Sequence, residues 1–415
     1  MSGLRVHVVV VGPRSGAADD GLAALQARLA AAGAPVVGRS YVEDDEGALE
    51  SVLGVGAGLT VILAAAAGAA ADVVRRVVAR AAGARLVLHE RLLAALTEAA
   101  RRADRPLPRE AERLAVLPQG ATVWLAPDAE PAWFLEAAGR AFAVLPRGGA
   151  LGPIVERHLA PWVAARAGGR AEVARTFRLA GVTLAEVEER LTGLLGALTL
   201  EPGTAAVSAM PAEGDVWVRV RARGATPAAA ERALAEVEAR LLPRLGEDCY
   251  GRDDETLERV VGRLLTARGL TLAVAESCTG GLLGHRLTNV PGASAYLERG
   301  VVVYSNRAKQ ELLGVPEAVL RTHGAVSAPC AEAMADGVVK RSGAACGVAI
   351  TGIAGPEGGT PDKPVGTVFV AVATPGASTV RRYRFAGDRA SIKWQATQAA
   401  LDLLRRCLRA DGPPA

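Results

Sequence analysis

Apolar and polar positions alternate along the first part of the chain in a way that predicts short strands separated by amphipathic helices. Continuous β-branched runs predict buried strands, and leucines at a spacing of three to four residues predict helices with one apolar face. In chain order these elements are a strand at Arg5–Val11, a helix at Asp20–Ala32, a strand at Val36–Val42, a helix at Glu46–Leu53, a strand at Leu59–Ala64, a helix at Ala70–Ala81, and strands at Gly120–Leu125 and Ala141–Leu145. Because strands and helices alternate, we expect a mostly parallel sheet with helices on both faces.

A change of pattern near Ala164–Ala171, where Ala, Gly and Arg dominate, predicts a linker. After it, Thr183 is placed to cap a helix, and valines alternate with Trp and Arg from Val216 to Arg221, which is typical of a half-exposed strand. A further helix is expected at Pro227–Leu242, with Thr226 at its N-cap. This order predicts a small α+β domain.

The last third of the chain predicts another α/β domain. An amphipathic helix is expected at Asp254–Leu264, a buried strand at Leu270–Ala275, and a final helix at Ser391–Arg409. Further strands are expected near Val301, Cys346 and Val365. The chain is therefore predicted to be α/β with three domains, at residues 1–167, 168–247 and 248–415.

Length and composition agree with several well-packed domains. The chain has 415 residues, half of them hydrophobic, and its net charge of +4 is small for this length. That charge favours neither nucleic acid nor a membrane surface as partner. The five cysteines form no CxxC pair, which is typical of reduced thiols in a cytoplasmic protein. No signal-peptide layout is found, and the apolar runs are too short to span a bilayer.

Three polar stretches each follow a predicted strand of the last domain. Ser277 lies in AESCTGG, Tyr304–Lys309 reads YSNRAK, and Thr351–Gly359 reads TGIAGPEGG. A strand end that runs into a helix offers backbone N–H groups to an anion, and a hydroxyl there can attack a carbonyl. The three stretches together form a candidate active site.

These motifs, followed by KPVGTV and FAGDR, resemble in order the C-terminal domain of the CinA family, from Asp254 to Leu408. Stand-alone members of that family are nicotinamide mononucleotide deamidases. The resemblance implies hydrolysis of the carboxamide of this nucleotide to nicotinate mononucleotide and ammonia, without a cofactor. We also expect the protein to be a homodimer. It carries catalytic roles onto Ser277, Tyr304 and Lys309.

Two choices stay open within this site. Either Lys309, with a pKa lowered by burial or a neighbouring cation, accepts the proton of Ser277, or a charged Lys309 lowers the pKa of Tyr304 so that Tyr304 accepts it. By residue pattern alone, Lys309 reads as an exposed helix lysine. Cys278 and Thr279 are the rival nucleophiles. A reactive thiol usually needs a nearby His, so we interpret Cys278 as a packing residue.

The substrate is expected to bind through the backbone of the glycine-rich turns and through a few polar side chains. Backbone N–H groups at the start of the helix after Ser277 can hold the oxyanion or the phosphate, and the TGIAGPEGG loop can wrap an anion. The expected substrate-binding residues are Thr279, Gly280, Gly281, Asn306, Thr351, Gly352, Gly355 and Arg389. Lys363 is a further candidate for the phosphate, and no metal ligands are expected.

The first domain resembles the molybdopterin-binding-like domain of CinA proteins, but its loops differ. Where the family has a Gly-rich acidic loop after the third strand, this chain reads AAAAGAAAD at Ala64–Asp72. We therefore expect that a divalent metal site has been lost and that the domain does not hydrolyse ADP-ribose. The middle domain resembles a KH-like domain without the GXXG loop that RNA binding needs. The alternative to the enzyme is a scaffold or regulator tied to competence and DNA repair.

Overall fold

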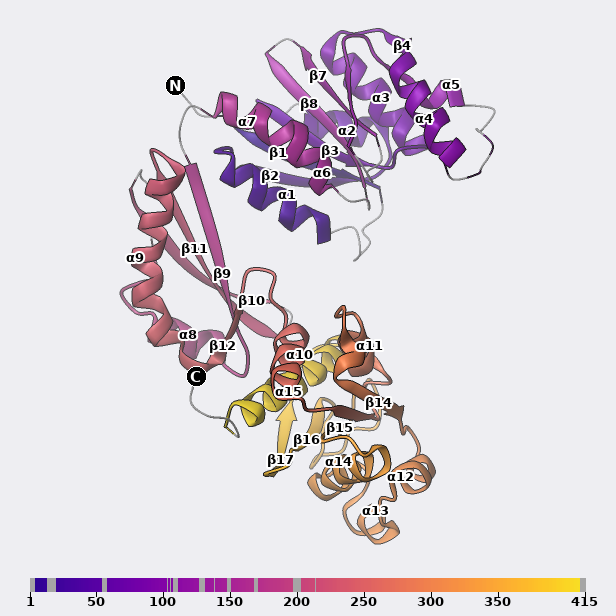
Figure 1. Ribbon diagram of the computed structural model, residues 1–415, viewed down its shortest axis with the longest axis vertical. Helices are drawn as coiled ribbons and strands as arrows, with labels where there is room; N and C mark the ends of the chain where they lie inside the picture. Colours follow the sequence, from indigo (N-terminus) through magenta and orange to yellow (C-terminus); the bar gives the residue numbers. More distant parts are fainter. Residues whose placement is uncertain are drawn as a thin grey trace. The chain divides into compact units, whose positions relative to one another are not determined.

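A computed structural model describes residues 4–12, 20–53, 58–102, 104, 106, 111–126, 131–137, 139–147, 151–167, 171–196, 203–212 and 214–410 (Figure 1). The chain forms two compact units. The first comprises Met1–Ala174, Ala197–Ala206 and Arg221–Val237, and the second comprises Arg175–Gly196, Val207–Val220 and Glu238–Ala415. Each unit is described by itself.

The first unit contains a six-stranded sheet in the order β2-β1-β3-β8-β7-β6. Its strands are β1 (Val6–Val11), β2 (Val36–Val42), β3 (Leu59–Ala64), β6 (Thr122–Trp124), β7 (Ala132–Ala137) and β8 (Arg140–Pro146). Strands β2, β1, β3 and β8 run parallel to one another. Strand β7 is antiparallel to β8, and β6 is antiparallel to β7. The predicted mostly parallel sheet is confirmed for the four strands, and the antiparallel pair extends one edge.

Helices cover both faces of this sheet, as Figure 1 shows. On one face, leucines of α1 (Asp20–Ala31) pack with the continuous helix formed by α6 (Gly152–Ile154), a π-helical turn at Val155–Leu159 and α7 (Ala160–Arg166). On the other face lie α2 (Glu46–Leu53), α3 (Ala69–Ala82) and α4 (Glu90–Arg102). Two short strands, β4 (Leu86–Leu88) and β5 (Val116–Pro118), and α5 (Ala111–Leu114) complete the unit's first domain.

The predicted linker is wrong at both of its ends. Residues 164–166 form the last turn of α7, and Ala171 already begins the next strand, β9 (Ala171–Leu179), so a regular element continues on each side. Residues 168–170 lie outside the described residues. Alanine and arginine are good helix formers, which is why their abundance at this point did not mark the end of a helix.

The middle segment forms a four-stranded sheet in the order β10-β11-β9-β12. The strands are β9 (Ala171–Leu179), β10 (Ala205–Ala212), β11 (Asp215–Gly224) and β12 (Cys249–Arg252), with α8 (Leu184–Arg190), α9 (Pro227–Leu245) and a 3₁₀ turn at Gly246–Asp248. Both predicted caps are confirmed. The Thr183 hydroxyl accepts from the Glu186 amide in a full capping box, and the Thr226 hydroxyl accepts from the Ala229 amide.

The second unit contains a five-stranded sheet in the order β14-β13-β15-β16-β17. Its strands are β13 (Leu272–Glu276), β14 (Leu297–Val302), β15 (Cys346–Gly352), β16 (Thr367–Ala373) and β17 (Ser378–Arg384). Strands β14, β13 and β15 are parallel, and β16 and β17 are antiparallel to their neighbours. The predicted strand near Val365 begins two residues later, at Thr367, because Gly366 bonds to Phe385 and Ile353 in the preceding turn.

Two helical layers enclose this sheet (Figure 1). The apolar faces of α10 (Leu257–Ala267), α11 (Leu282–Thr288) and α15 (Arg389–Ala410) form one core, and α12 (Asn306–Leu313) and α14 (Ala328–Ser342) form the other. Helix α13 (Glu317–His323) and a 3₁₀ turn at Ala293–Ala295 complete the domain. Helix α10 begins three residues later than predicted because Asp253, at a positive φ of 52°, forms a turn before it.

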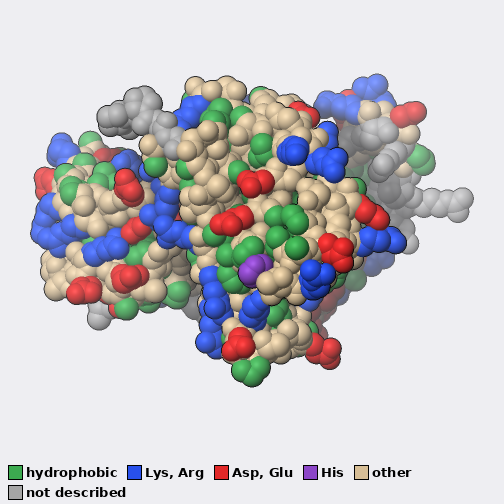
Figure 2. All heavy atoms as spheres, turned by 90° about the horizontal axis from the view of Figure 1, so that it is seen from below, with side chains coloured by type: hydrophobic (Ala, Val, Ile, Leu, Met, Phe, Trp, Pro, Cys, Tyr) green, Lys and Arg blue, Asp and Glu red, His purple; other side chains and the backbone are tan. Residues whose placement is uncertain are grey.

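Charges are mixed on the surface. On the face drawn in Figure 2, basic and acidic side chains are interspersed. Among the described residues, no helix combines the length and the apolar character that a bilayer span requires.

Candidate active site

The carboxyl ends of three parallel strands bring the predicted motifs together. Glu276, at the end of β13, lies opposite Val302 of β14 and Ile350 of β15. The pairing continues one residue further, because the Ser277 amide donates to the Ile350 carbonyl at 3.0 Å and the Val303 amide donates to the Glu276 carbonyl at 2.8 Å. Ligands of open α/β sheets bind beyond such strand ends, so the sheet places all three motifs at one binding edge.

Ser277 and Lys309 are in direct contact. The Nζ atom of Lys309 lies 3.1 Å from the Ser277 hydroxyl, 2.8 Å from the Val303 carbonyl and 3.2 Å from the Tyr304 carbonyl. Lys309 is 1% exposed although it lies only one turn into α12, whose N-cap Ser305 accepts from the Ala308 amide. The helix therefore turns its fourth residue inward, onto the nucleophile candidate.

Burial lowers the pKa of Lys309, because the charged ammonium loses its hydration and no carboxylate is bonded to it in the described structure. Three oxygens around Nζ can take the three N–H donors of an ammonium, and the same contacts can be made by a neutral amine. Its two N–H groups can donate to the carbonyls of Val303 and Tyr304, which leaves the lone pair facing the Ser277 hydroxyl. In that form Ser277 donates and Lys309 accepts, which is the arrangement of a nucleophile with its base.

The expected free amides at the start of α11 are already bonded within the protein. The buried Glu276 carboxylate accepts from the amides of Gly281 at 3.0 Å, Leu283 at 3.0 Å and Gly284 at 2.8 Å. The Gly280 amide donates to the Ser277 carbonyl. Gly280 and Gly281 thus hold the turn through positive φ values of 63° and 96°, and their N–H groups do not point at a ligand as the sequence suggested.

Two other amides of the same turn remain available. In the part of the chain that the structure describes, neither the Cys278 nor the Thr279 amide donates to another residue. The Thr279 hydroxyl is also fully buried and has no partner among the described residues. Since buried donors without partners are costly, and the amide after a nucleophile is the usual oxyanion donor, these groups are candidates for the oxyanion site.

Tyr304 takes a different place from Lys309. Its side chain is 62% exposed, and its hydroxyl accepts from the Arg389 guanidinium at 3.1 Å. Arg389, the first residue of α15, also donates to the Gly355 carbonyl at 2.7 Å. These bonds link the strand end after β14, the glycine-rich loop and α15, and they leave an exposed cation at the edge of the site.

The remaining predicted residues have structural partners or lie further out. The Thr351 hydroxyl donates to the Ala325 carbonyl at 2.7 Å, and Thr351 is buried. A Cβ on Gly352 would lie 2.7 Å from a Val368 methyl, so packing against β16 requires this glycine. Asn306 is exposed at the first position of α12. Lys363 donates to the His323 carbonyl at 3.0 Å.

Cys278 is 6% exposed, and burial raises the pKa of its thiol to about 12. Such a group stays a thiol near neutral pH and is a poor nucleophile.

The role of Glu276 was missed by sequence reasoning. Glu276 follows an apolar strand, and nothing in the pattern shows that its carboxylate turns back onto the next helix. Lys393 lies with its Nζ 3.6 Å from where a Cβ on Gly280 would stand. Arg389 and Lys393 are four residues apart on α15 and therefore share one helix face.

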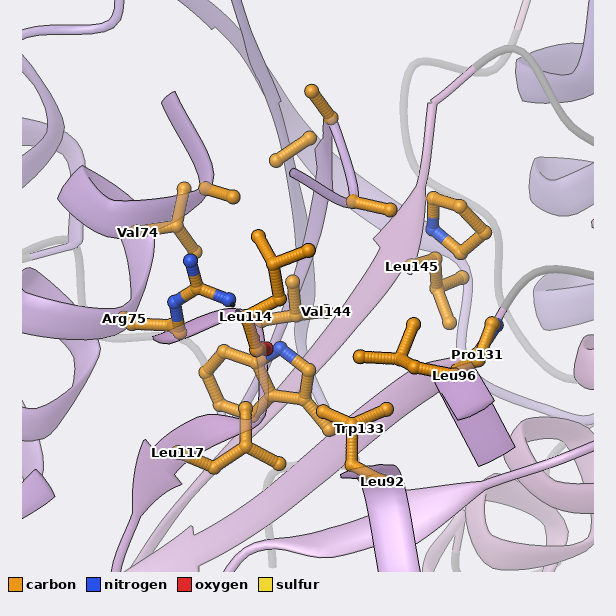
Figure 3. Close-up of a pocket in the computed structure, with 15 residues that line it drawn as sticks. Val74, Arg75, Leu92, Leu96, Leu114, Leu117, Pro131, Trp133, Val144 and Leu145 are labelled. Atoms are coloured by element: carbon orange, nitrogen blue, oxygen red, sulfur yellow. Dashed lines mark hydrogen bonds between the residues drawn. The ribbon is translucent and has the colours of Figure 1, made fainter. Parts of the chain in front are cut away.

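In the first unit, the alanine loop after β3 lines an apolar pocket. Ala64, Ala65, Ala66 and Ala71 contribute to its wall together with Trp133, and Figure 3 shows the Trp133 indole among aliphatic side chains. Asp72 is bonded to the guanidinium groups of Arg75 and Arg113, which lower the pKa of its carboxyl group. Among the described residues, no group of three or more His, Cys, Asp or Glu side chains is arranged to hold a metal.

Comparison with known proteins gives the family. The profile of the CinA C-terminal domain matches residues 254–408, and that of the damage-inducible protein CinA KH domain matches residues 174–251. A CinA-like protein of Geobacter sulfurreducens is 42% identical over 406 residues, covering 94% of this chain and 95% of its own, and one of Syntrophus aciditrophicus is 40% identical over 382 residues, covering 90% of each. A solved competence damage-inducible protein A of Klebsiella pneumoniae is 38% identical, with a TM-score of 0.37, covering 38% of this chain and 97% of its own.

Proposed function

The chain belongs to the CinA family, and on that premise we propose that its C-terminal domain hydrolyses the carboxamide of nicotinamide mononucleotide to nicotinate mononucleotide and ammonia. The observation that carries the reaction type is the contact between Lys309 Nζ and the Ser277 hydroxyl at 3.1 Å in a buried position. The choice of substrate rests on the family resemblance of the motifs. The proposed domains are residues 1–167, 168–247 and 248–415, and β12, which lies just beyond the second boundary, pairs with β9 of the middle sheet.

In this proposal the reaction proceeds through an acyl-enzyme. Neutral Lys309 takes the proton of Ser277 as its oxygen attacks the amide carbon, and the oxygen that becomes negative is met by the Cys278 and Thr279 amides. Lys309 then gives the proton to the departing nitrogen, which leaves as ammonia. A water molecule attacks the ester carbon and gives one proton to Lys309, and Lys309 passes that proton to the Ser277 oxygen as the acyl–oxygen bond breaks. The carboxylic acid is released, and Ser277 and neutral Lys309 are restored. The scheme uses side chains, backbone amides and water.

Geometry favours Lys309 over Tyr304 as the proton acceptor. Lys309 touches the Ser277 hydroxyl, whereas the Tyr304 hydroxyl is bonded to Arg389 and is exposed. Arg389 and Lys393, on one face of α15, supply positive charge suited to the substrate's phosphate. In this proposal Tyr304 orients Arg389 and the phosphate.

The purified full-length protein should release ammonia and nicotinate mononucleotide from nicotinamide mononucleotide in equal amounts. Chromatography with mass detection of the nucleotide and an enzymatic ammonia assay measure the two products. Nicotinamide riboside, which lacks the phosphate, is the matched substrate and should react with a KM at least about tenfold higher, because a charge-assisted contact is lost. Absence of ammonia release from protein that is folded would contradict the proposal and favour the scaffold or regulator.

The first domain should not hydrolyse ADP-ribose, even with Mg²⁺, Mn²⁺ and potassium supplied. Cleavage of a phosphoanhydride needs charge stabilisation, usually by a carboxylate-held metal, and the carboxylate of Asp72 in the alanine loop is already bonded to two arginines. Release of AMP is the measurement. Metal-dependent AMP production that disappears on replacing Asp72 with Ala would show that this interpretation of the loop is wrong.

A further inference from the structure

Asp215, the first residue of β11 in the middle domain, makes a buried contact with the C-terminal domain. Its side chain accepts from the Tyr250 hydroxyl on one oxygen and from the Gln398 amide nitrogen on the other, at 2.6 Å. The residue is 8% exposed. Because Gln398 lies on α15, this contact fastens a strand of the middle domain to a helix that covers the sheet of the C-terminal domain.

The side-chain amide of Gln398 joins Asp215 to Arg286, a residue of the helix that follows the Ser277 turn. While its nitrogen donates to Asp215, its oxygen accepts from the Arg286 guanidinium. An acceptor at one end and a donor at the other fix the orientation of the amide, since the reversed amide would face each group with the wrong polarity. A change at Asp215 can therefore alter the hydrogen bond that Arg286 makes, because the Gln398 side chain is bonded to both residues.

Arg286 lies on α11, the helix that follows the Ser277 turn. It is 3% exposed, donates to Glu258 at 2.8 Å and to Thr397 at 2.9 Å, and stacks on the Trp394 ring at 4.2 Å. The other end of α11 is held by Glu276, the residue before Ser277. The position of this two-turn helix is thus set by one group at its beginning and by another near its end.

We propose that Asp215 is a positioning residue for Ser277, acting through Gln398 and Arg286, so that the middle domain sets the position of α11 and of the nucleophile turn. The proposal rests on the function proposed above. It makes the middle domain part of the working enzyme and gives it a task other than binding nucleic acid.

The same contact makes the link sensitive to pH. Burial raises the pKa of Asp215 to about 6. The hydrogen bonds from Tyr250 and Gln398 and the positive charges of Arg178 and Arg286, which face its carboxyl group, act in the opposite direction and lower this pKa. Because this pKa is above the ordinary value, the stability that Asp215 contributes is full below about pH 4 and is lost as the pH rises through about 6.

The test compares Asp215→Ala with a matched control, Asp248→Ala. Asp248 accepts from Arg190 of α8 at 2.6 Å and from Arg406 of α15 at 2.7 Å, so it joins the same two domains without a bond to α11. Both variants should lower the melting temperature at pH 5, where Asp215 still contributes stability. Only Asp215→Ala should lower kcat, by about tenfold and with KM within about twofold, because the position of the nucleophile and not the binding of substrate is disturbed.

The isostere Asp215→Asn keeps an acceptor for Gln398 and should restore kcat to within about threefold of the parent. Its melting temperature relative to the parent should rise by about 3 °C from pH 5 to pH 7.5, because the buried charge is gone. Equal effects of Asp215→Ala and Asp248→Ala on kcat, or none, overturn the proposal. Hydrogen exchange of the α11 amides tests it even if the protein deamidates nothing, since Asp215→Ala alone should speed that exchange.

Discussion

Replacing Ser277 with alanine should reduce the rate of deamidation by at least about 10³-fold, because the variant loses the nucleophile and leaves Lys309 without a proton to accept. The Ser277 side chain is small, so the turn held by Glu276 should keep its structure and the substrate should still bind. The rate of ammonia release at saturating nicotinamide mononucleotide measures the first effect, and calorimetric titration with the same nucleotide measures the second. The parent enzyme, quenched in acid during turnover, should carry an ester on Ser277 that mass spectrometry detects.

The adjacent Cys278 provides the matched control. Its thiol is buried, with a pKa raised to about 12, and it packs in the core of the α11 and α15 face. Cys278→Ala should therefore keep activity within about threefold while destabilising the domain by about 1 kcal/mol through the lost packing. If Cys278→Ala is inactive and Ser277→Ala is active, the nucleophile has been assigned to the wrong residue.

The elements around the site could be predicted because their periodicity is strong. Strand β13 is an apolar run that ends in a polar turn, and Ser305 and Thr183 cap helices in the way that their hydroxyl groups favour. Strand β17 was missed, since Arg381, Arg382 and Arg384 make it polar on both faces. It pairs with β16 and lies at the edge of the sheet, where charged residues protect the outer edge of a strand from association and also hide the strand's alternation.

The environment of the site residues could not be predicted in the same way. A lysine one turn into a polar helix is typical of a solvated face, and only the packing of α12 against α14 and the strand ends buries Lys309. From the sequence alone, the Glu276 side chain could face solvent, a metal or a helix. The left-handed turn at Gly280 and Gly281 brings the amides at the start of α11 within hydrogen-bonding distance of its carboxylate. Contacts such as these arise from residues far apart in sequence, which local patterns do not encode.

Replacing Lys309 with methionine should reduce kcat/KM by about 10²- to 10⁴-fold, the usual contribution of a general base. Methionine fits a buried position, so the variant should remain folded, although the carbonyls of Val303 and Tyr304 lose their donor. Lys309→Arg is the informative partner, because arginine is always positively charged and cannot give up a proton to become a base. A purely electrostatic role of Lys309 would leave Lys309→Arg active, whereas a role as general base predicts that both variants lose activity.

The pH dependence of the parent enzyme gives the same test without a mutation. Burial lowers the pKa of Lys309, and only the neutral amine can accept the Ser277 proton, so kcat/KM should rise with pH and level off at a pH below the ordinary lysine pKa of about 10.4. The stability of the domain should also rise with pH, because the unfolded chain binds the Lys309 proton more tightly than the folded protein does. The domain should therefore lose stability as the pH falls from the ordinary lysine pKa through the lowered pKa of Lys309. In Lys309→Met that loss should be absent, which a series of thermal melts between pH 6 and pH 10 can show. An activity profile that is flat over this range, or that falls as the pH rises, would remove Lys309 as the base.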